Sequence, residues 1–170
     1  CASPNQLGLR SHASDMAEAV KRRLYLSLGS NIQPKKHLDL AVKLLGERCQ
    51  LERVSSFWKS PAVGTDGPDF LNAAGQVNTS LTPGEFKEKV IQPLERELGR
   101  RRTADKFAPR PIDIDILVWG NQVLDMDLWR YAHLAVPLAE ICPELLRSPD
   151  GSSLHELAEA MAEQGNISPE

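Results

Sequence analysis

The order of periodic segments along residues 23–118 limits the fold more than any other feature of this sequence. Segments with the period of strands or of helices alternate there as strand, helix, strand, strand, helix, strand. In chain order they are residues 23–31, a helix from Lys35 onward, and residues 50–60, 71–81, 82–99 and 111–118. This is the split βαβ order, so we expect an α+β ferredoxin-like sandwich, an antiparallel sheet with helices packed on it.

Capping boxes, in which Ser or Thr is followed three residues later by Glu, predict helix starts at Thr82 and Ser153. Pro83 suits the first helical position after Thr82, and Gly99 is a suitable end. Pro93 lies inside this helix and predicts a kink, because proline lacks the N–H that the helix needs.

The flanks of this pattern are less regular. The sequence of residues 119–150 predicts irregular structure, with a short helical segment at 134–145 that prolines interrupt. Residues 1–22 are polar without a period and predict a disordered or peripheral extension. We therefore expect one domain over residues 23–165.

The charge balance excludes several classes of partner. The chain has 23 acidic and 20 basic residues, a formal net charge of −3, so it does not resemble a polyanion-binding protein. It also lacks the aromatic run of RNA-binding sheets, so we expect no nucleic-acid partner. No apolar run approaches the roughly 18 residues of a membrane span, so we expect no membrane partner. The 3 cysteines lack the spacing of a metal site or of a disulfide framework, which predicts a reducing compartment, the cytoplasm. We also expect the protein to be a monomer.

Apolar and acidic residues alternate strictly from Ile112 to Ile116. On a strand, Asp113 and Asp115 then share one face, with α-carbons roughly 6.5–7 Å apart. Such a pair suits Mg²⁺, which takes one or two carboxylates together with water and phosphate oxygens. The alternative is a half-buried strand that shows its polar side to water.

A cationic segment precedes this strand. Cations are the preferred residues at the end of a helix, so a solvated helix end is one interpretation. Beside a carboxylate pair, arginines also neutralise phosphate oxygens, and the two features together predict polyphosphate binding with Mg²⁺. The glycine-rich phosphate loops GxxxxGK[ST] and GxGxxG are absent from the sequence. The cations are Arg96, Arg100, Arg101, Arg102, Lys106 and Arg110.

Four motifs in this order resemble the 6-hydroxymethyl-7,8-dihydropterin pyrophosphokinase family: "LYLSLGSN", "VSSFWKSPAVG", "DFLNAA" and "PRPIDIDIL". The resemblance spans about residues 23–125 and returns at "VPLAEICPEL". It implies transfer of pyrophosphate from MgATP to the hydroxymethyl group of the pterin, with release of AMP, in folate biosynthesis. Two alternatives stay open, a non-catalytic pterin or nucleotide sensor and another Mg-dependent phosphotransferase that acts on a heterocycle.

The resemblance also implies roles for single residues. Asp113 and Asp115 match the ligands of two Mg²⁺ ions, and Arg100 and Arg102 match a catalytic arginine loop. Positions that match the ATP site are Gln92, Glu95, Lys106, Arg110 and Ile116, and positions that match the pterin site are Ser60, Pro61, Val63, Gly64, Phe70, Asn72 and Phe107.

One stretch departs from the family pattern. The family carries a Pro-His pair and then an arginine and a phenylalanine after the aspartate strand, in a segment that helps to hold ATP. Residues 125–136 are several residues shorter and lack that pair. Arg130 and His133 lie nearby but out of register, and we expect them to replace the missing nucleotide contacts.

Overall fold

The structure, a computed structural model, describes residues 20–101, 104–105, 108–142 and 146–170. In these ranges the strands are β1 (Arg22–Ser30), β2 (Gln50–Val54), β3 (Trp58–Ser60), β4 (Phe70–Thr79), β5 (Asp113–Trp119), β6 (Gln122–Val123) and β7 (Ser168–Pro169). The helical segments are α2 (Pro34–Arg48), α3 (Pro83–Phe86), η1 (Lys87–Ile91), α4 (Gln92–Glu97), η2 (Met126–Trp129), α5 (Ala132–Ile141) and α6 (Leu154–Glu163). None of these helices is long and apolar enough to cross a membrane.

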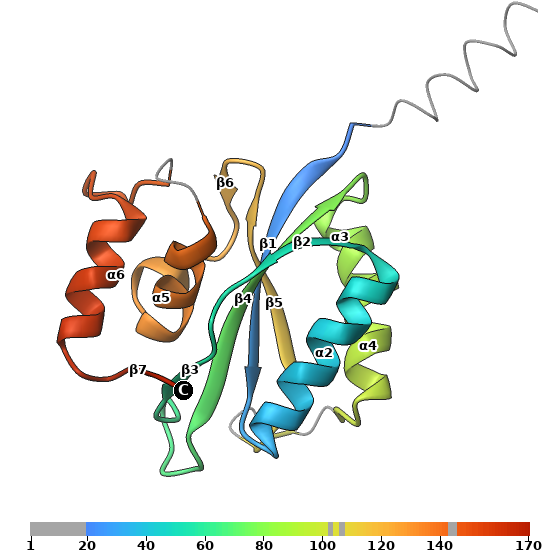
Figure 1. Cartoon of the computed structure of the whole chain (residues 1–170), viewed down its shortest axis with the longest axis horizontal. Coiled ribbons are helices and arrows are strands. Elements are labelled where there is room, and N and C mark those ends of the chain that lie inside the picture. Colours follow the sequence, from blue (N-terminus) through green and yellow to red (C-terminus); the bar gives the residue numbers. More distant parts are fainter. Residues whose placement is uncertain (1–19, 102–103, 106–107, 143–145) are drawn as a thin grey trace, which may run out of the picture.

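The strands form one antiparallel sheet with β1 at its centre (Figure 1). β1 pairs with β4 on one side and with β5 on the other, while β2 and β3 share the far edge of β4. This order confirms the ferredoxin-like expectation, because the first strand is inserted between the two strands that follow later in the chain.

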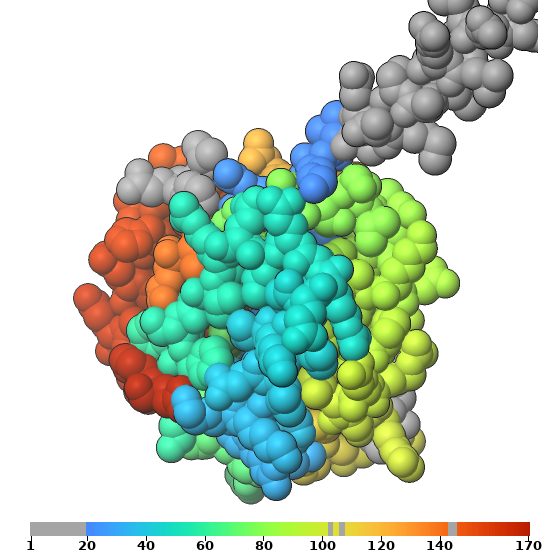
Figure 2. All heavy atoms as spheres, turned by 45° about the vertical axis from the view of Figure 1, so that its right-hand side comes forward, coloured from blue at the N-terminus to red at the C-terminus, as the bar shows by residue number. Residues whose placement is uncertain are grey.

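The two faces of the sheet carry different elements (Figure 1). Side chains alternate along β1, so Leu24, Leu26 and Leu28 pack into one core cluster with α2 and α4. Tyr25 belongs to a second cluster, with α5 and α6, on the opposite face. In the space-filling view, α2 and the segment α3–η1–α4 close over the first face (Figure 2). The second face, beneath α5, is therefore where the odd-numbered residues of β1 point, together with Asp113, Asp115 and Leu117 of β5.

Three expectations about local structure need correction or refinement. Residues 50–60 form two strands rather than one, because Ser55 turns its N–H and its hydroxyl oxygen to the backbone of Ala74. Residues 119–150 are more regular than expected, since α5 continues through Pro137. The kink expected at Pro93 takes the form of the π-helical turn η1, which ends directly before α4.

The chain end returns to the sheet after α6. β7 pairs with β3 in the register Trp58–Pro169 and Lys59–Ser168. Glu170 donates its N–H to the Phe57 carbonyl at 3.1 Å, so this pairing lies beyond the expected domain limit at residue 165. In Figure 2 the red chain end meets the start of α2, where Glu170 pairs with a lysine of that helix.

Candidate active site

Alternation along three neighbouring strands brings polar side chains together on the second face of the sheet. In the register, Gly29 of β1 lies opposite both Asn72 of β4 and Asp113 of β5. Two residues earlier on β1, Ser27 lies opposite Asp115. Because residues i and i+2 of a strand share a face, all of these positions open onto one region beneath α5.

A pocket of about 380 Å³ occupies this region. The three strands form its floor, the loop after β3 forms one wall, and the start of α5 forms another. Apolar and polar side chains share the lining, which suits a flat heterocycle with a polar edge. The lining includes five of the seven positions expected to bind pterin, namely Ser60, Pro61, Val63, Phe70 and Asn72.

The other two expected pterin positions have different outcomes. Gly64 is not among the lining residues, but it has a φ of 77° in the loop that forms the wall. That left-handed conformation favours glycine, so Gly64 shapes the loop. Phe107 lies outside the described residues, as do Arg102 and Lys106.

Asn72 is held in one orientation by the end of β3. Its side-chain N–H groups donate to the Trp58 carbonyl at 3.1 Å and to the Ser60 hydroxyl oxygen at 2.8 Å. Both donors of the amide are thereby used, and its oxygen is left to meet a ligand. The geometry therefore presents the acceptor of this amide to a ligand.

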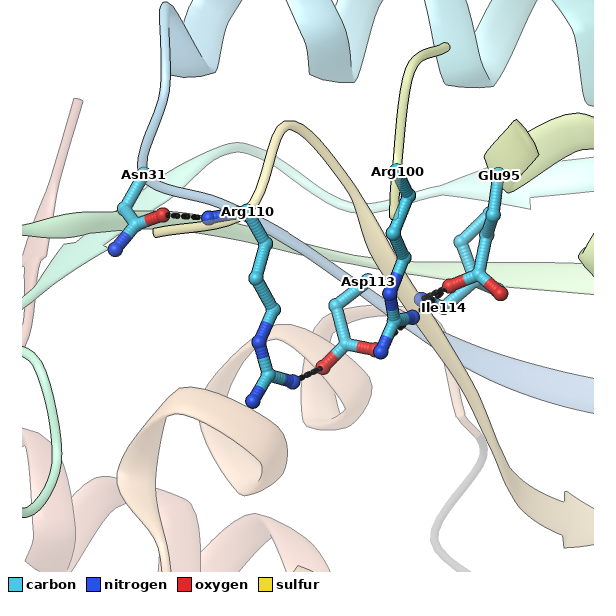
Figure 3. Close-up of polar contacts among 6 residues, drawn as sticks. All are labelled: Asn31, Glu95, Arg100, Arg110, Asp113 and Ile114. Atoms are coloured by element: carbon cyan, nitrogen blue, oxygen red, sulfur yellow. Dashed lines mark hydrogen bonds and ion pairs between the residues drawn. The ribbon is translucent and has the colours of Figure 1, made fainter. Parts of the chain in front are cut away.

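A chain of charges runs along the edge of the pocket (Figure 3). Asp113 accepts from Arg100 at 2.6 Å and from Arg110 at 3.0 Å. Arg100 also pairs with Glu95, whose carboxylate accepts the Ile114 N–H at 3.2 Å. The two arginines therefore pair with different oxygens of one aspartate, and both belong to the segment between α4 and β5.

Burial and neighbouring charges shift the pKa values of Glu95 and Arg100. Burial raises the pKa of the Glu95 carboxyl, although Arg100 and the Ile114 N–H oppose the shift. Burial would by itself lower the pKa of Arg100, but the attraction of Asp113 and Glu95 outweighs it and raises that pKa. The two carboxylates beside Arg100 thus hold the proton on its guanidinium.

Asp115 behaves differently from its neighbour Asp113. No ion pair to Asp115 is present among the residues that the structure describes. Its carboxyl is exposed to the pocket, yet the surrounding protein still removes part of its hydration. This desolvation, followed by repulsion from Asp113, Asp125 and Glu95, raises the pKa of Asp115 to about 6. A cation brought beside Asp115 would relieve that repulsion.

A second hollow, of about 380 Å³, adjoins the charged chain on the side of α4. Its lining includes Gln92 and Glu95, which were expected at the ATP site, and also Arg96 and Arg100. The ion pair between Arg100 and Asp113 connects this hollow to the first pocket. Ile116, another expected ATP position, packs instead against the core cluster of the opposite face.

The shortened segment contributes to the pocket through α5. His133 lines it, and burial lowers the pKa of its imidazole. Arg130 does not line it: the side chain is 70% exposed and lies 3.7 Å from Asp127. The structure therefore separates the two residues that we expected to act together.

Among the lining residues that sequence reasoning missed, three come from the segment between β6 and α5 and carry polar side chains: Asp125, Asp127 and Tyr131. Asp125 accepts the Asp127 N–H at 3.0 Å and so caps η2. The alternation "DMD" at 125–127 was a usable signal, because it repeats the pattern of the aspartate strand. Tyr131 had no comparable signal, since its position depends on where α5 begins.

Comparison with known proteins supplies the family. The family model for 7,8-dihydro-6-hydroxymethylpterin-pyrophosphokinase (HPPK) matches residues 25–143. The chain belongs to the HPPK family. This range contains all the pterin and ATP positions expected from the sequence, the shortened segment included.

Curated relatives agree with this assignment, and a solved structure shares the fold. The 2-amino-4-hydroxy-6-hydroxymethyldihydropteridine pyrophosphokinase of Pseudomonas aeruginosa is 33% identical over 156 residues, which cover 85% of this chain and 94% of the relative. The Bacillus subtilis protein of the same name is 35% identical over 71% of this chain and 78% of its own length. A Plasmodium falciparum HPPK-DHPS structure with pteroate has a TM-score of 0.62 at 13% identity. It shares the fold with 89% of this chain, which spans just under half (47%) of the Plasmodium chain.

Proposed function

We propose that this HPPK chain transfers pyrophosphate from ATP to the hydroxymethyl group of 6-hydroxymethyl-7,8-dihydropterin and releases AMP. One observation carries the proposal: the ion pair of Asp113 and Arg100 lies between two hollows, one lined by the pterin positions and one by nucleotide positions. A phosphate chain that crosses this boundary would meet the pterin hydroxyl at its β-phosphorus.

The first pocket supports the role of pterin site. The Asn72 oxygen is fixed as an acceptor, which suits the N–H groups along the edge of a pterin. Phe70 and Val63 supply apolar surface for the ring system. We assign pterin recognition to these side chains and to the loop from Ser60 to Gly64.

The two arginines beside Asp113 support phosphate binding. A guanidinium binds phosphate oxygens through two parallel hydrogen bonds, as it binds a carboxylate. Arg100 and Arg110 both pair with Asp113, so a nucleotide would draw them from the carboxylate toward its phosphates. During transfer, the β-phosphorus forms a bond to the hydroxymethyl oxygen and its bond to the α,β-bridging oxygen breaks. The charge of the arginines then stabilises the negative charge that moves onto AMP.

We assign Mg²⁺ binding to Asp113 and Asp115, with two ions as the family resemblance implies. The residues fit this role, because two carboxylates on one face leave the remaining coordination positions to water and phosphate. No cluster of three or more candidate metal ligands exists among the described residues. The chemistry that Mg²⁺ supplies when bound is neutralisation and polarisation of the phosphate groups.

Mixing the protein with ATP, Mg²⁺ and 6-hydroxymethyl-7,8-dihydropterin tests the proposal. Mass spectrometry should detect AMP and the pterin pyrophosphate in equal amounts. Replacement of Mg²⁺ by excess chelator should abolish both products. Binding of both substrates without AMP would overturn the transfer reaction and favour a sensor, while formation of ADP would indicate another phosphotransferase.

A further inference from the structure

Asn31, which directly follows β1, holds the backbone of Arg110 through two hydrogen bonds. The Arg110 N–H donates to the Asn31 side-chain oxygen at 2.6 Å (Figure 3). The Asn31 N–H donates to the Arg110 carbonyl at 3.2 Å. The two residues lie 79 positions apart in the chain, and Asn31 is buried with 7% exposure. One residue thus binds both backbone polar groups of an arginine that lines the pocket.

The register of the sheet explains why a side chain, and not a backbone carbonyl, accepts the Arg110 N–H. β1 and β5 pair with Leu28 opposite Ile114 and Gly29 opposite Asp113. Continuing that register by two residues places Asn31 opposite Pro111, which has no N–H to donate. The Asn31 oxygen reaches the next available donor, the N–H of Arg110, and so extends the pairing beyond the end of the strands.

The sequence around Arg110 makes this contact decisive for the segment. Pro109 and Pro111 flank the arginine, so it carries the only backbone N–H among those three residues. Proline also restricts the residue before it to extended conformations, which leaves the segment stiff. A stiff segment transmits the loss of a backbone contact to the side chain of the same residue.

Arg110 in turn reaches the charged centre. Its guanidinium donates to Asp113 at 3.0 Å, three residues further along the chain. The two contacts of Asn31 and the ion pair with Asp113 therefore locate both ends of this arginine relative to β1 and β5. Asn31 itself is not among the residues that line either hollow.

We propose that Asn31 is a positioning residue, which fixes Arg110 at the place where a nucleoside triphosphate presents its phosphates. This inference rests on the proposed function, because it takes Arg110 as a phosphate ligand. Asn31 acts through Arg110 alone and touches neither substrate.

The test compares Asn31→Ala with Asn31→Asp, which keeps an acceptor oxygen at the same distance. Asn121→Ala is the matched control, because Asn121 is exposed in the turn between β5 and β6. Calorimetry measures binding of α,β-methylene-ATP with Mg²⁺, and separately of the pterin. Loss of one hydrogen bond should weaken nucleotide binding about fivefold to tenfold in Asn31→Ala. Pterin affinity should stay within about twofold, and Asn31→Asp should retain most of the nucleotide affinity.

Two further measurements separate positioning from general stability. In the protein without substrates, the amide proton of Arg110 should exchange faster in Asn31→Ala, as read by NMR. In an Arg110→Ala background, Asn31→Ala should cause no further loss of nucleotide affinity, because Asn31 acts on the nucleotide through the guanidinium that Arg110→Ala removes. A general loss of fold would weaken binding of both substrates in either background.

The outcomes distinguish this inference from the proposed function. Wild-type nucleotide affinity in Asn31→Ala, or an equal loss with and without Arg110, overturns the positioning role while AMP formation stands. A wild-type protein that binds the analogue but forms no AMP overturns the transfer reaction and leaves the Asn31 comparison decisive. A wild-type protein that does not bind the analogue overturns both.

Discussion

Arg100 lies 2.6 Å from Asp113, across the boundary between the two hollows of the site. The same guanidinium pairs with Glu95 of α4, so the residue connects the helix on one face to the strand that carries the aspartates. Asp113 also accepts a hydrogen bond from Arg110, so each of the two carboxylate oxygens of Asp113 has an arginine partner. A nucleotide must therefore exchange these contacts for its own phosphates, whereas Asp115 is available to a cation from the start.

Asp113→Asn and Asp115→Asn should each lower the rate of AMP formation by at least about a hundredfold, because each removes a charge that holds the phosphates' counterion. The shapes of the side chains are unchanged, so both variants should retain the circular dichroism of the wild type. Asp39→Asn on the exposed side of α2 is the matched control and should keep wild-type activity. Near-normal rates in either site variant at ordinary Mg²⁺ would remove that aspartate from the metal site.

The pKa of Asp115, raised to about 6, predicts a pH-dependent difference in stability between the wild type and Asp115→Asn. The folded pKa lies above the unfolded value, so protonation stabilises the fold. That contribution is complete below about pH 4 and is lost as the pH rises through about 6. Without metal at pH 7.5, Asp115→Asn should therefore unfold at higher urea than the wild type, and the gap should close near pH 4. A constant gap across this range would contradict the raised pKa.

Arg100→Ala should reduce the rate of transfer by about one to two decades, the value of a charged hydrogen bond. Pterin affinity should change little, because Arg100 lines the hollow on the α4 side and not the pterin pocket. Arg101→Ala, one residue further on and exposed, is the control for loss of positive charge alone. Single-turnover kinetics with saturating ATP would show the loss in the chemical step, and an equal loss in both variants would mean that Arg100 acts only through net charge.

Local sequence patterns predicted those elements whose structure depends on residues that are close together in the chain. The period of 23–31, the capping box at Thr82 and the alternation at 112–116 each determine an element without help from the rest of the chain. The pairing of Asp113 with Arg100 needed the sheet register and the turn after α4, which no local pattern contains. The same holds for the cover that α5 provides, because its packing on the second face depends on contacts with distant strands.

The site shows the same division between local and long-range information. Motif order placed Ser60, Phe70 and Asn72 at one pocket, yet the orientation of the Asn72 amide follows from the Trp58 carbonyl and the Ser60 hydroxyl. Sequence spacing also grouped Arg130 with His133, three residues apart. Only the start of α5 at Ala132 decides which of the two faces the pocket.

The last prediction concerns that separation. His133 lines the pocket beside the aspartates, and burial lowers the pKa of its imidazole, which favours the neutral ring. His133→Ala should therefore weaken substrate binding about fivefold to tenfold. This is the effect expected if the ring in the pocket wall makes one hydrogen bond to the substrate.

Arg130→Ala should have a smaller effect on binding, because its side chain is 70% exposed and its contact with Asp127 is a surface ion pair. Calorimetry of α,β-methylene-ATP and of the pterin against both variants separates the two residues. If Arg130→Ala instead loses one to two decades of nucleotide affinity, then the arginine turns inward when the phosphates arrive. The shortened segment would in that case replace the missing family contacts through Arg130, by a rearrangement of the 3.7 Å pair with Asp127. If neither variant changes nucleotide binding, the segment covers the sheet, and the nucleotide depends on Arg100 and Arg110.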